Sequence, residues 1–235
     1  MSYGKLYLIP VPLGEGVRDA SFTPHTIEII SNLQEFIVEN EKTARKFIKL
    51  ADPKVIQEQL ILYNYGKHAR DKFDINNLIK RLKNGVDIGL MSEAGCPAVA
   101  DPGSNIVREV HKNGIKIVPL VGPSSILLAL MASGFNGQGF AFEGYLPIGK
   151  EERVRKIKSM ELRVLKEKQT QIFMETPFRN NQLLSELIRI CKPQTQLSVA
   201  MNLTLENEQI VTQTIATWRT TKIDLHKIPV IFLLF

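Results

Sequence analysis

The amino-acid sequence predicts an α/β protein with a largely parallel sheet in its first half and a mixed sheet in its second half. In the first half, short apolar runs alternate with segments of helical periodicity, which is typical of parallel strands covered by helices. In the second half, apolar runs follow one another directly, which indicates antiparallel pairing as well. The 235 residues suffice for two domains. We expect a boundary near residue 121, giving domains 1–121 and 122–235.

The elements of the first half follow from apolar periodicity and from the residues that interrupt it. Prolines and a glycine end the first strand, and Thr23 followed by Pro24 is typical of a helix start. Asp74 is placed to cap a helix that Gly85 ends. The predicted strands are 6–11, 36–38, 60–63, 86–91 and 115–120, and the predicted helices are 24–33, 43–50, 74–83 and 102–112.

The second half begins with a helix that starts at Pro123 and ends before Gly134. The predicted helices are 123–133, 151–168 and 178–190, and the predicted strands are 140–143, 172–175, 197–201, 209–215 and 229–235. The helix at 151–168 is strongly charged, and two interpretations stay open for it. It presents either a solvated face with pairs such as Glu152 and Lys156 or a basic strip for RNA phosphates.

Composition excludes several classes of protein. No apolar run reaches the roughly 18 residues that a membrane helix needs, and the first residues lack the pattern of a signal peptide. Two cysteines in unlike contexts and four scattered histidines predict neither a disulfide framework nor a metal site. We therefore expect a cytoplasmic protein without a membrane partner. The net charge of +6 favours a polyanionic partner such as RNA.

Ligands of parallel sheets bind at the carboxyl ends of the strands, so three turns are candidates: 10–16, 92–103 and 121–125. The turn at 92–103 is the richest, because its glycines and prolines exceed what chain reversal requires and leave main-chain groups accessible. An ordinary connector, with Asp101 capping the next helix, is the alternative. Likewise, Gly122 to Ser125 either binds a ligand carboxylate or hydroxyl or simply caps a helix.

Two nucleotide-binding motifs are excluded. Residues 144–150 have the spacing of a phosphate-binding loop, but Glu151 stands where magnesium coordination needs serine or threonine. Pro147 also removes one of the amides that such a loop uses. No Gly-x-Gly-x-x-Gly follows the first strand, which argues against a dinucleotide site.

Taken together, the turns resemble a known family. Residues 92–97 (Ser-Glu-Ala-Gly-Cys-Pro) and 101–103 (Asp-Pro-Gly) are similar to the Ser-Asp-Ala-Gly-Thr-Pro and Asp-Pro-Gly of bacterial enzymes that methylate a cytidine 2′-hydroxyl of 16S rRNA. These enzymes form a branch of the tetrapyrrole methylase (class III) superfamily. Further matches in the same order are Gly-Pro-Ser at 122–124, Phe-Glu-Gly-Tyr-Leu-Pro at 142–147, Glu-Thr-Pro-Phe-Arg at 175–179 and Val-Ala-Met-Asn-Leu-Thr at 199–204.

The resemblance implies two α/β/α domains with a cleft between them that binds S-adenosylmethionine (SAM). It also implies a homodimer that methylates a ribose of ribosomal RNA in the small ribosomal subunit. By matching position, the SAM-binding residues are Pro12, Gly14, Ser92, Glu93, Ala94, Gly95, Pro97, Ser124, Ser125, Phe142, Met201, Asn202 and Leu203.

Departures from the family pattern fall on the acceptor side. The family's Glu-Asp-Thr-Arg appears here as Glu-Asn-Glu-Lys at 39–42, and its Arg-Glu has become Met201 and Asn202. Glu39, Arg45 and His68 are candidates for the catalytic base only because they align with polar family positions. Two alternatives therefore stay open: methylation of a tetrapyrrole or other small molecule, and a protein that binds SAM or RNA without catalysis.

Overall fold

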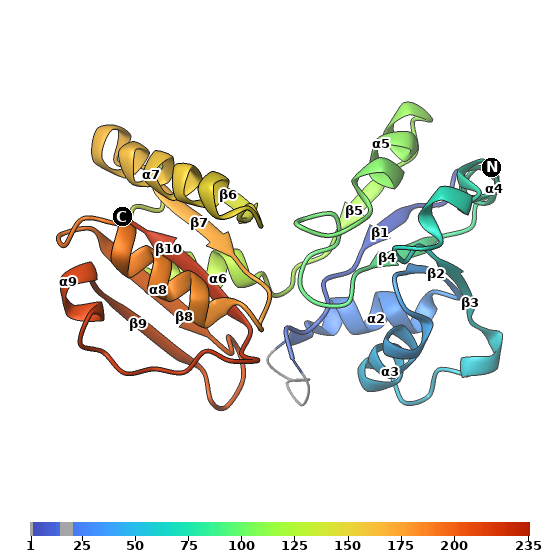
Figure 1. The fold of residues 1–235 in the computed structure, drawn as a ribbon. Helices are drawn as coiled ribbons and strands as arrows, with labels where there is room; N and C mark the ends of the chain where they lie inside the picture. The colour runs from blue at the N-terminus through green and yellow to red at the C-terminus, as the bar shows by residue number, and fades with distance from the viewer. Residues whose placement is uncertain (1, 15–20) are drawn as a thin grey trace. The chain divides into compact units, whose positions relative to one another are not determined.

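The computed structural model describes residues 2–14 and 21–235, which form two compact units (Figure 1). The first unit ends at Ser124 and the second runs from Ser125 to Phe235, so the division falls slightly after the expected boundary. Each unit has its own sheet and its own hydrophobic core. Within the described ranges, no helix is long and apolar enough to cross a lipid bilayer.

The first unit contains a five-stranded parallel sheet in the order β3-β2-β4-β1-β5. This confirms the prediction of parallel strands. The strands are β1 (Leu6–Leu8), β2 (Glu35–Val38), β3 (Ile61–Asn64), β4 (Ile88–Met91) and β5 (Ile117–Pro119). The helices are α2 (Pro24–Asn32), α3 (Glu41–Ala51), α4 (Ile75–Lys83) and α5 (Ser104–Lys112), with 3-10 turns at Gln57–Gln59 and Arg70–Lys72.

Helices cover both faces of this sheet because successive strand residues point to opposite sides. Phe36 packs into a core with Ile30 of α2 and Phe47 of α3. Its neighbour Ile37 belongs to a second core, which includes Leu82 of α4. Both strand side chains are fully buried, which explains why the strands read as continuous apolar runs.

The second unit has a mixed five-stranded sheet in the order β6-β7-β10-β8-β9. β6 and β7 are parallel, whereas β10 is antiparallel to both of its neighbours and β9 is antiparallel to β8. The strands are β6 (Phe140–Tyr145), β7 (Thr170–Met174), β8 (Gln196–Met201), β9 (Gln209–Thr214) and β10 (Val230–Leu234). The helices are α6 (Ser125–Ser133), α7 (Lys150–Glu167), α8 (Asn180–Ile190) and the short α9 (Ile215–Trp218).

Ion pairs fasten α7 to its surroundings. Arg153 makes a buried bidentate pair with Glu186 of α8, with N–O distances of 2.6 and 2.7 Å. Its third nitrogen donates to the carbonyls of Pro147 and Ile148. The loop at 144–150 is thus tied to α7 by its carbonyl groups.

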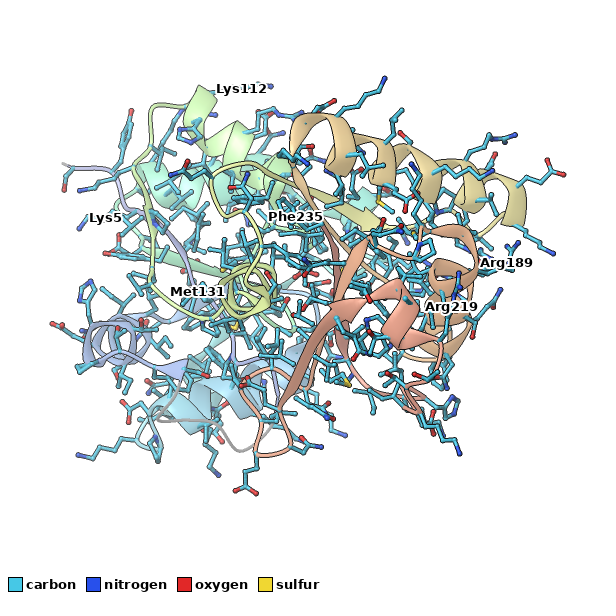
Figure 2. All side chains as sticks on the ribbon, turned by 90° about the vertical axis from the view of Figure 1, so that its left-hand side faces the viewer. Lys5, Lys112, Met131, Arg189, Arg219 and Phe235 are labelled. Atoms are coloured by element: carbon cyan, nitrogen blue, oxygen red, sulfur yellow. The ribbon has the colours of Figure 1, made fainter. Side chains whose placement is uncertain are left out.

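On α6, the side chain of Met131 is exposed to solvent (Figure 2).

Several predicted bounds differ from the structure by a few residues, and three local differences have a clear physical reason. The first strand ends at Leu8 instead of residue 11, because Pro10 has no N–H for the sheet. The strand predicted at 209–215 ends at Thr214, whose side chain accepts the Thr217 N–H and starts α9. Asp101 does not cap α5, because Gly103 occupies the cap position with a φ of +128° and no side-chain hydrogen bond.

Candidate functional site

Three turns of the first unit meet at the carboxyl edge of its parallel sheet. The Val11 N–H donates to the Gly95 carbonyl (2.9 Å), and the Gly95 N–H donates to the Val11 carbonyl (2.8 Å). These bonds join the turn after β1 to the turn after β4. The turn after β5 joins them through the Cys96 thiol, whose sulfur lies 3.4 Å from the Pro123 carbonyl oxygen. The structure thus brings together the three segments that the sequence identifies as candidates.

Glycine is required at two positions in these turns. Gly95 has a φ of +71°, and a Cβ there would lie 3.4 Å from the Leu13 Cδ2. A Cβ on Gly122 would lie 2.4 Å from the Pro10 Cβ, closer than two carbon atoms can approach. Gly95 is therefore required by its backbone conformation, and Gly122 by the close approach of the Pro10 ring.

Four of the residues predicted to bind the cofactor line one pocket of about 450 Å³ in the first unit. They are Pro12, Gly14, Glu93 and Ala94. Phe47 and Leu50 of α3 add apolar side chains to the wall. Apolar walls with a few polar groups suit a ligand that has both a flat ring and charged ends. Ser92, Gly95 and Pro97 lie on the same turn and are buried.

The remaining predicted cofactor residues lie at the boundary of the two units or within the second unit. Ser124 is the last residue of the first unit, and Ser125 is the first residue of α6. Met201 is the buried last residue of β8, followed by Asn202 in a left-handed conformation (φ +49°) and the buried Leu203. Phe142 lies on β6, three positions from β8 in the sheet order, which corresponds to about 14 Å at 4.8 Å per strand.

Charged groups gather where β2 and β4 end. Glu39 directly follows β2, and its Oε2 lies 3.8 Å from the Arg70 Nη2. Its Oε1 is buried and has no hydrogen-bond partner in the described part of the chain. Glu93 and Asp101, from the turn after β4, are the carboxylates whose charges act on Glu39. Arg70 is held in place by its Nε, which donates to the Tyr65 carbonyl (3.2 Å).

These surroundings favour the protonated form of two carboxyl groups. Burial raises the pKa of Glu39, and the negative charge of Asp101 raises it further. Burial likewise raises the pKa of Asp101, against the lowering effect of the Ser92 hydroxyl. A carboxylate that binds a proton more readily than usual is suited to general-base chemistry near neutral pH. Across residues 2–14 and 21–235, no set of three histidine, cysteine or acidic side chains is arranged to hold a metal ion.

The other two candidate bases are placed differently. The Arg45 Nη1 donates to the Gln57 carbonyl (2.5 Å), so this side chain fastens the segment before β3 to α3. His68 is exposed in the turn that follows β3. Of the three candidates, Glu39 is the one that shares its surroundings with the carboxylates of the turn after β4.

Asn40, which replaces an aspartate of the family pattern, has a structural role. Its Oδ1 accepts the N–H groups of Lys42 (2.9 Å) and Thr43 (3.3 Å) and so caps α3. We expect Asn40→Ala to lower the free energy of unfolding by about 1 kcal/mol. Asn40→Asp should keep wild-type stability, because a carboxylate is favourable at a helix N-terminus. Urea denaturation measures both, and an equal loss for both variants would contradict the prediction.

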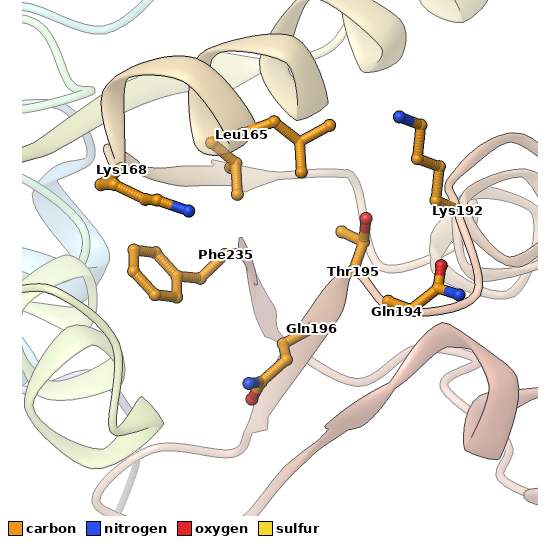
Figure 3. Close-up of a pocket in the computed structure, with 8 residues that line it drawn as sticks. Leu165, Lys168, Lys192, Gln194, Thr195, Gln196 and Phe235 are labelled. Carbon is orange, nitrogen blue, oxygen red and sulfur yellow. The ribbon is translucent and has the colours of Figure 1, made fainter.

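A second pocket, of about 280 Å³, lies at the opposite end of β8 from the candidate residues (Figure 3). It is lined in part by Lys168, Lys192 and Phe235, and Figure 3 shows Lys168 beside the Phe235 ring. β8 runs from Gln196 to Met201, which spans roughly 17 Å at 3.3 Å per residue. This pocket is therefore separate from the cofactor residues of the second unit.

Sequence reasoning missed Arg70 and the role of Asp101. Asp101 precedes a proline and a glycine, and this pattern suggested a helix cap. One signal for the role of Asp101 was available. Asp101 lies in a turn at the carboxyl edge of the predicted sheet, where polar side chains from neighbouring turns converge. Arg70 follows β3 by six residues, inside a short 3-10 turn that periodicity does not reveal.

Comparison with known proteins gives consistent matches. The family model for tetrapyrrole (corrin/porphyrin) methylases matches residues 5–218. A Bacillus subtilis (strain 168) protein named ribosomal RNA small subunit methyltransferase I is 33% identical over 214 residues, which are 91% of this chain and 68% of that protein. A Thermotoga maritima protein of the same name is 32% identical over 187 residues, which are 80% of this chain and 78% of that protein.

Solved structures show the same fold. The methyltransferase CobJ aligns with a TM-score of 0.62 at 16% identity, covering 100% of this chain and 94% of CobJ. Uroporphyrin-III C-methyl transferase from Thermus thermophilus, complexed with S-adenyl homocysteine, aligns with a TM-score of 0.55 at 14% identity, covering 98% and 97% of the two chains. At such identities the likeness establishes the fold alone, and it confirms the predicted fold class.

Proposed function

Because this chain belongs to the tetrapyrrole (corrin/porphyrin) methylase family, we propose that it methylates a ribose hydroxyl of ribosomal RNA. The chain is a SAM-dependent methyltransferase, as the resemblance predicts. The names of the Bacillus subtilis and Thermotoga maritima relatives support small-subunit RNA as the acceptor class. The net charge of +6 also favours RNA over an uncharged small molecule.

The single observation that carries the donor site is the meeting of three turns at Gly95. SAM supplies a methyl group on a positively charged sulfur, which becomes a neutral thioether when the methyl group leaves. A flat adenine fits between apolar side chains such as Phe47 and Leu50, while main-chain groups of the turns can recognise polar edges. Glu93 adds a carboxylate to the pocket wall that can attract a cationic group. We propose that the predicted residues on these turns bind the donor, whereas Phe142, Met201, Asn202 and Leu203 of the second unit stay predictions.

Glu39 is the proposed proton acceptor. A ribose hydroxyl must lose its proton during or after methyl transfer, and a partly buried carboxylate with a free oxygen can take that proton. Burial raises the pKa of Glu39, and the positive charge of Arg70, 3.8 Å away, acts in the opposite direction. Asp101 and Glu93 hold further negative charge nearby and so strengthen the affinity of Glu39 for a proton.

Two features of assembly and location complete the proposal. The family resemblance suggests a homodimer, and the exposed Met131 on the apolar helix α6 offers a side chain for such an interface. Cys96 and Cys191 are both free thiols, which suits a reducing cytoplasm. Sedimentation velocity would give the oligomeric state, and a monomer at micromolar concentration would contradict the proposed homodimer.

Two measurements test the proposed function. We expect calorimetry to detect binding of SAM and of its demethylated product, and ribose-methylation mapping of 16S rRNA to lose one site when the gene is deleted. Reconstitution with purified protein should restore that site. If SAM binds but the RNA map is unchanged, and a tetrapyrrole or other small molecule is methylated instead, then the acceptor assignment is wrong. If no acceptor is methylated, the acceptor-side substitutions have removed catalysis.

A further inference from the structure

Phe178 is an exposed aromatic residue in the loop that follows β7. Its side chain is 69% exposed, although the residues on both sides of it are half-buried. One neighbouring ring accompanies it: His226 lies 6.0 Å away, centroid to centroid, at an angle of 70°. The position therefore leaves most of an aromatic surface open to solvent.

Hydrogen bonds hold the two loops that carry these rings. The Lys227 N–H donates to the Pro177 carbonyl (3.0 Å), and the Asn180 side chain donates to the Ile228 carbonyl (2.7 Å). Asn181 bonds both the Asp224 carboxylate (2.7 Å) and the Leu225 N–H (2.8 Å). The backbone of both loops is thus fixed before any ligand arrives, which limits the conformational entropy that stacking on the rings would cost.

The loops adjoin the cofactor residues predicted in the second unit. β10 lies between β7 and β8, and its register places Val230 opposite Met201 and Ile231 opposite Met174. The Asn202 N–H donates to the Pro229 carbonyl (3.1 Å), in the same loop that carries His226. Phe178 therefore stands at the same edge of this sheet as Met201, Asn202 and Leu203, the cofactor residues predicted in the second unit.

We propose that Phe178, supported by His226, is a stacking platform for one base of a single-stranded segment of the RNA acceptor. The proposal rests on the proposed function. Proteins read single-stranded RNA largely by stacking unpaired bases on aromatic side chains, and any base can stack. Arg179 pairs with the Glu175 carboxylate, and the exposed Lys227 can meet a phosphate. Asp224 keeps its negative charge, because its partner Asn181 is a neutral amide.

The experiment compares Phe178→Ala with Phe140→Ala. Phe140 is a matched control, because its side chain is also exposed (40%) but lies at the opposite end of the sheet, where β6 begins. Fluorescence anisotropy with labelled 16S rRNA fragments measures RNA binding, and calorimetry measures SAM binding. We expect Phe178→Ala to weaken RNA binding about 5- to 150-fold, the range for losing one stacked base, with unchanged SAM affinity. Phe140→Ala should change neither.

Two more variants separate stacking from simple apolar contact. Phe178→Trp should keep RNA affinity within about threefold, whereas Phe178→Leu should lose most of what Phe178→Ala loses. Wild-type RNA affinity in Phe178→Ala, or equal affinity in the leucine and tryptophan variants, would overturn the stacking platform and leave the methyltransferase assignment intact. Absence of RNA binding and of RNA methylation by the wild-type protein would overturn both. An apolar contact with a second copy of the chain would appear as altered sedimentation of the alanine variant but not of the leucine variant, without altered RNA affinity, which also overturns the platform.

Discussion

Gly95→Val is expected to abolish detectable SAM binding while leaving the protein folded. The two hydrogen bonds between Gly95 and Val11 join the turns, and Leu13 lies 3.4 Å from the position of a new Cβ. A branched side chain there would fill the space in which main-chain groups meet the ligand. We expect at least about a 100-fold loss of affinity, or about 2.7 kcal/mol, the size of two lost main-chain hydrogen bonds. Calorimetry with SAM measures the loss.

Gly114→Val is the matched control for this variant. Gly114 has a similar φ of +65°, so a valine there meets the same backbone strain. Gly114 follows α5 at the amino end of β5, and no described heavy atom lies within 4 Å of its Cβ position. The control should lose stability yet bind SAM normally. If both variants bind SAM like the wild type, the donor site is not at Gly95.

Glu39→Gln is expected to lower kcat by about 10²- to 10⁴-fold, the usual range for removing a general base. SAM affinity should not change, because the substitution is isosteric and acts on the acceptor proton. Glu41→Gln, an exposed acid in the first turn of α3, is the control and should have wild-type kcat. In the wild-type enzyme, the raised pKa of Glu39 should shift the acidic limb of the pH–rate profile above the ordinary range of a glutamate. A variant with wild-type kcat would exclude Glu39 as the base.

The same raised pKa predicts how stability depends on pH. The folded protein binds the Glu39 proton more tightly than the unfolded chain does, so this group favours the folded state at low pH. That contribution is lost as the pH rises from the ordinary value of 4.5 through the higher value of the folded protein. We therefore expect Glu39→Gln to be more stable than the wild type near neutral pH. Urea denaturation at several pH values should show this difference disappearing below pH 4.5.

Much of the fold could be predicted from the sequence because the strands are buried on both faces. Runs such as 36–38 and 88–91 carry no polar side chain on either face of the sheet, and the helices between them show clear periodicity. The order of strands in the second unit could not be predicted. An apolar run does not specify which other strand it will pair with. β10 pairs with β7 and β8, both of which are distant from it in the sequence.

Parts of the candidate site were also beyond sequence reasoning. The turns themselves were identifiable from their glycines and prolines, since these residues allow the close approach seen between Gly122 and Pro10. The grouping of Glu39 with Asp101 depends on β2 and β4 being neighbours in the sheet, which no local pattern reveals. The short helix α9, of 4 residues, is likewise too short for periodicity to reveal.

The place of β10 has a consequence for protein synthesis. Residues 230–234 form the middle strand of the second unit, yet the ribosome makes them after every other strand of that unit. Until they leave the exit tunnel, β6 and β7 are separated from β8 and β9, and the side chains that pack on Phe232 stay open to water. The first unit can complete its sheet during translation, whereas the second must wait, and in that interval its unpaired strand edges are exposed to aggregation.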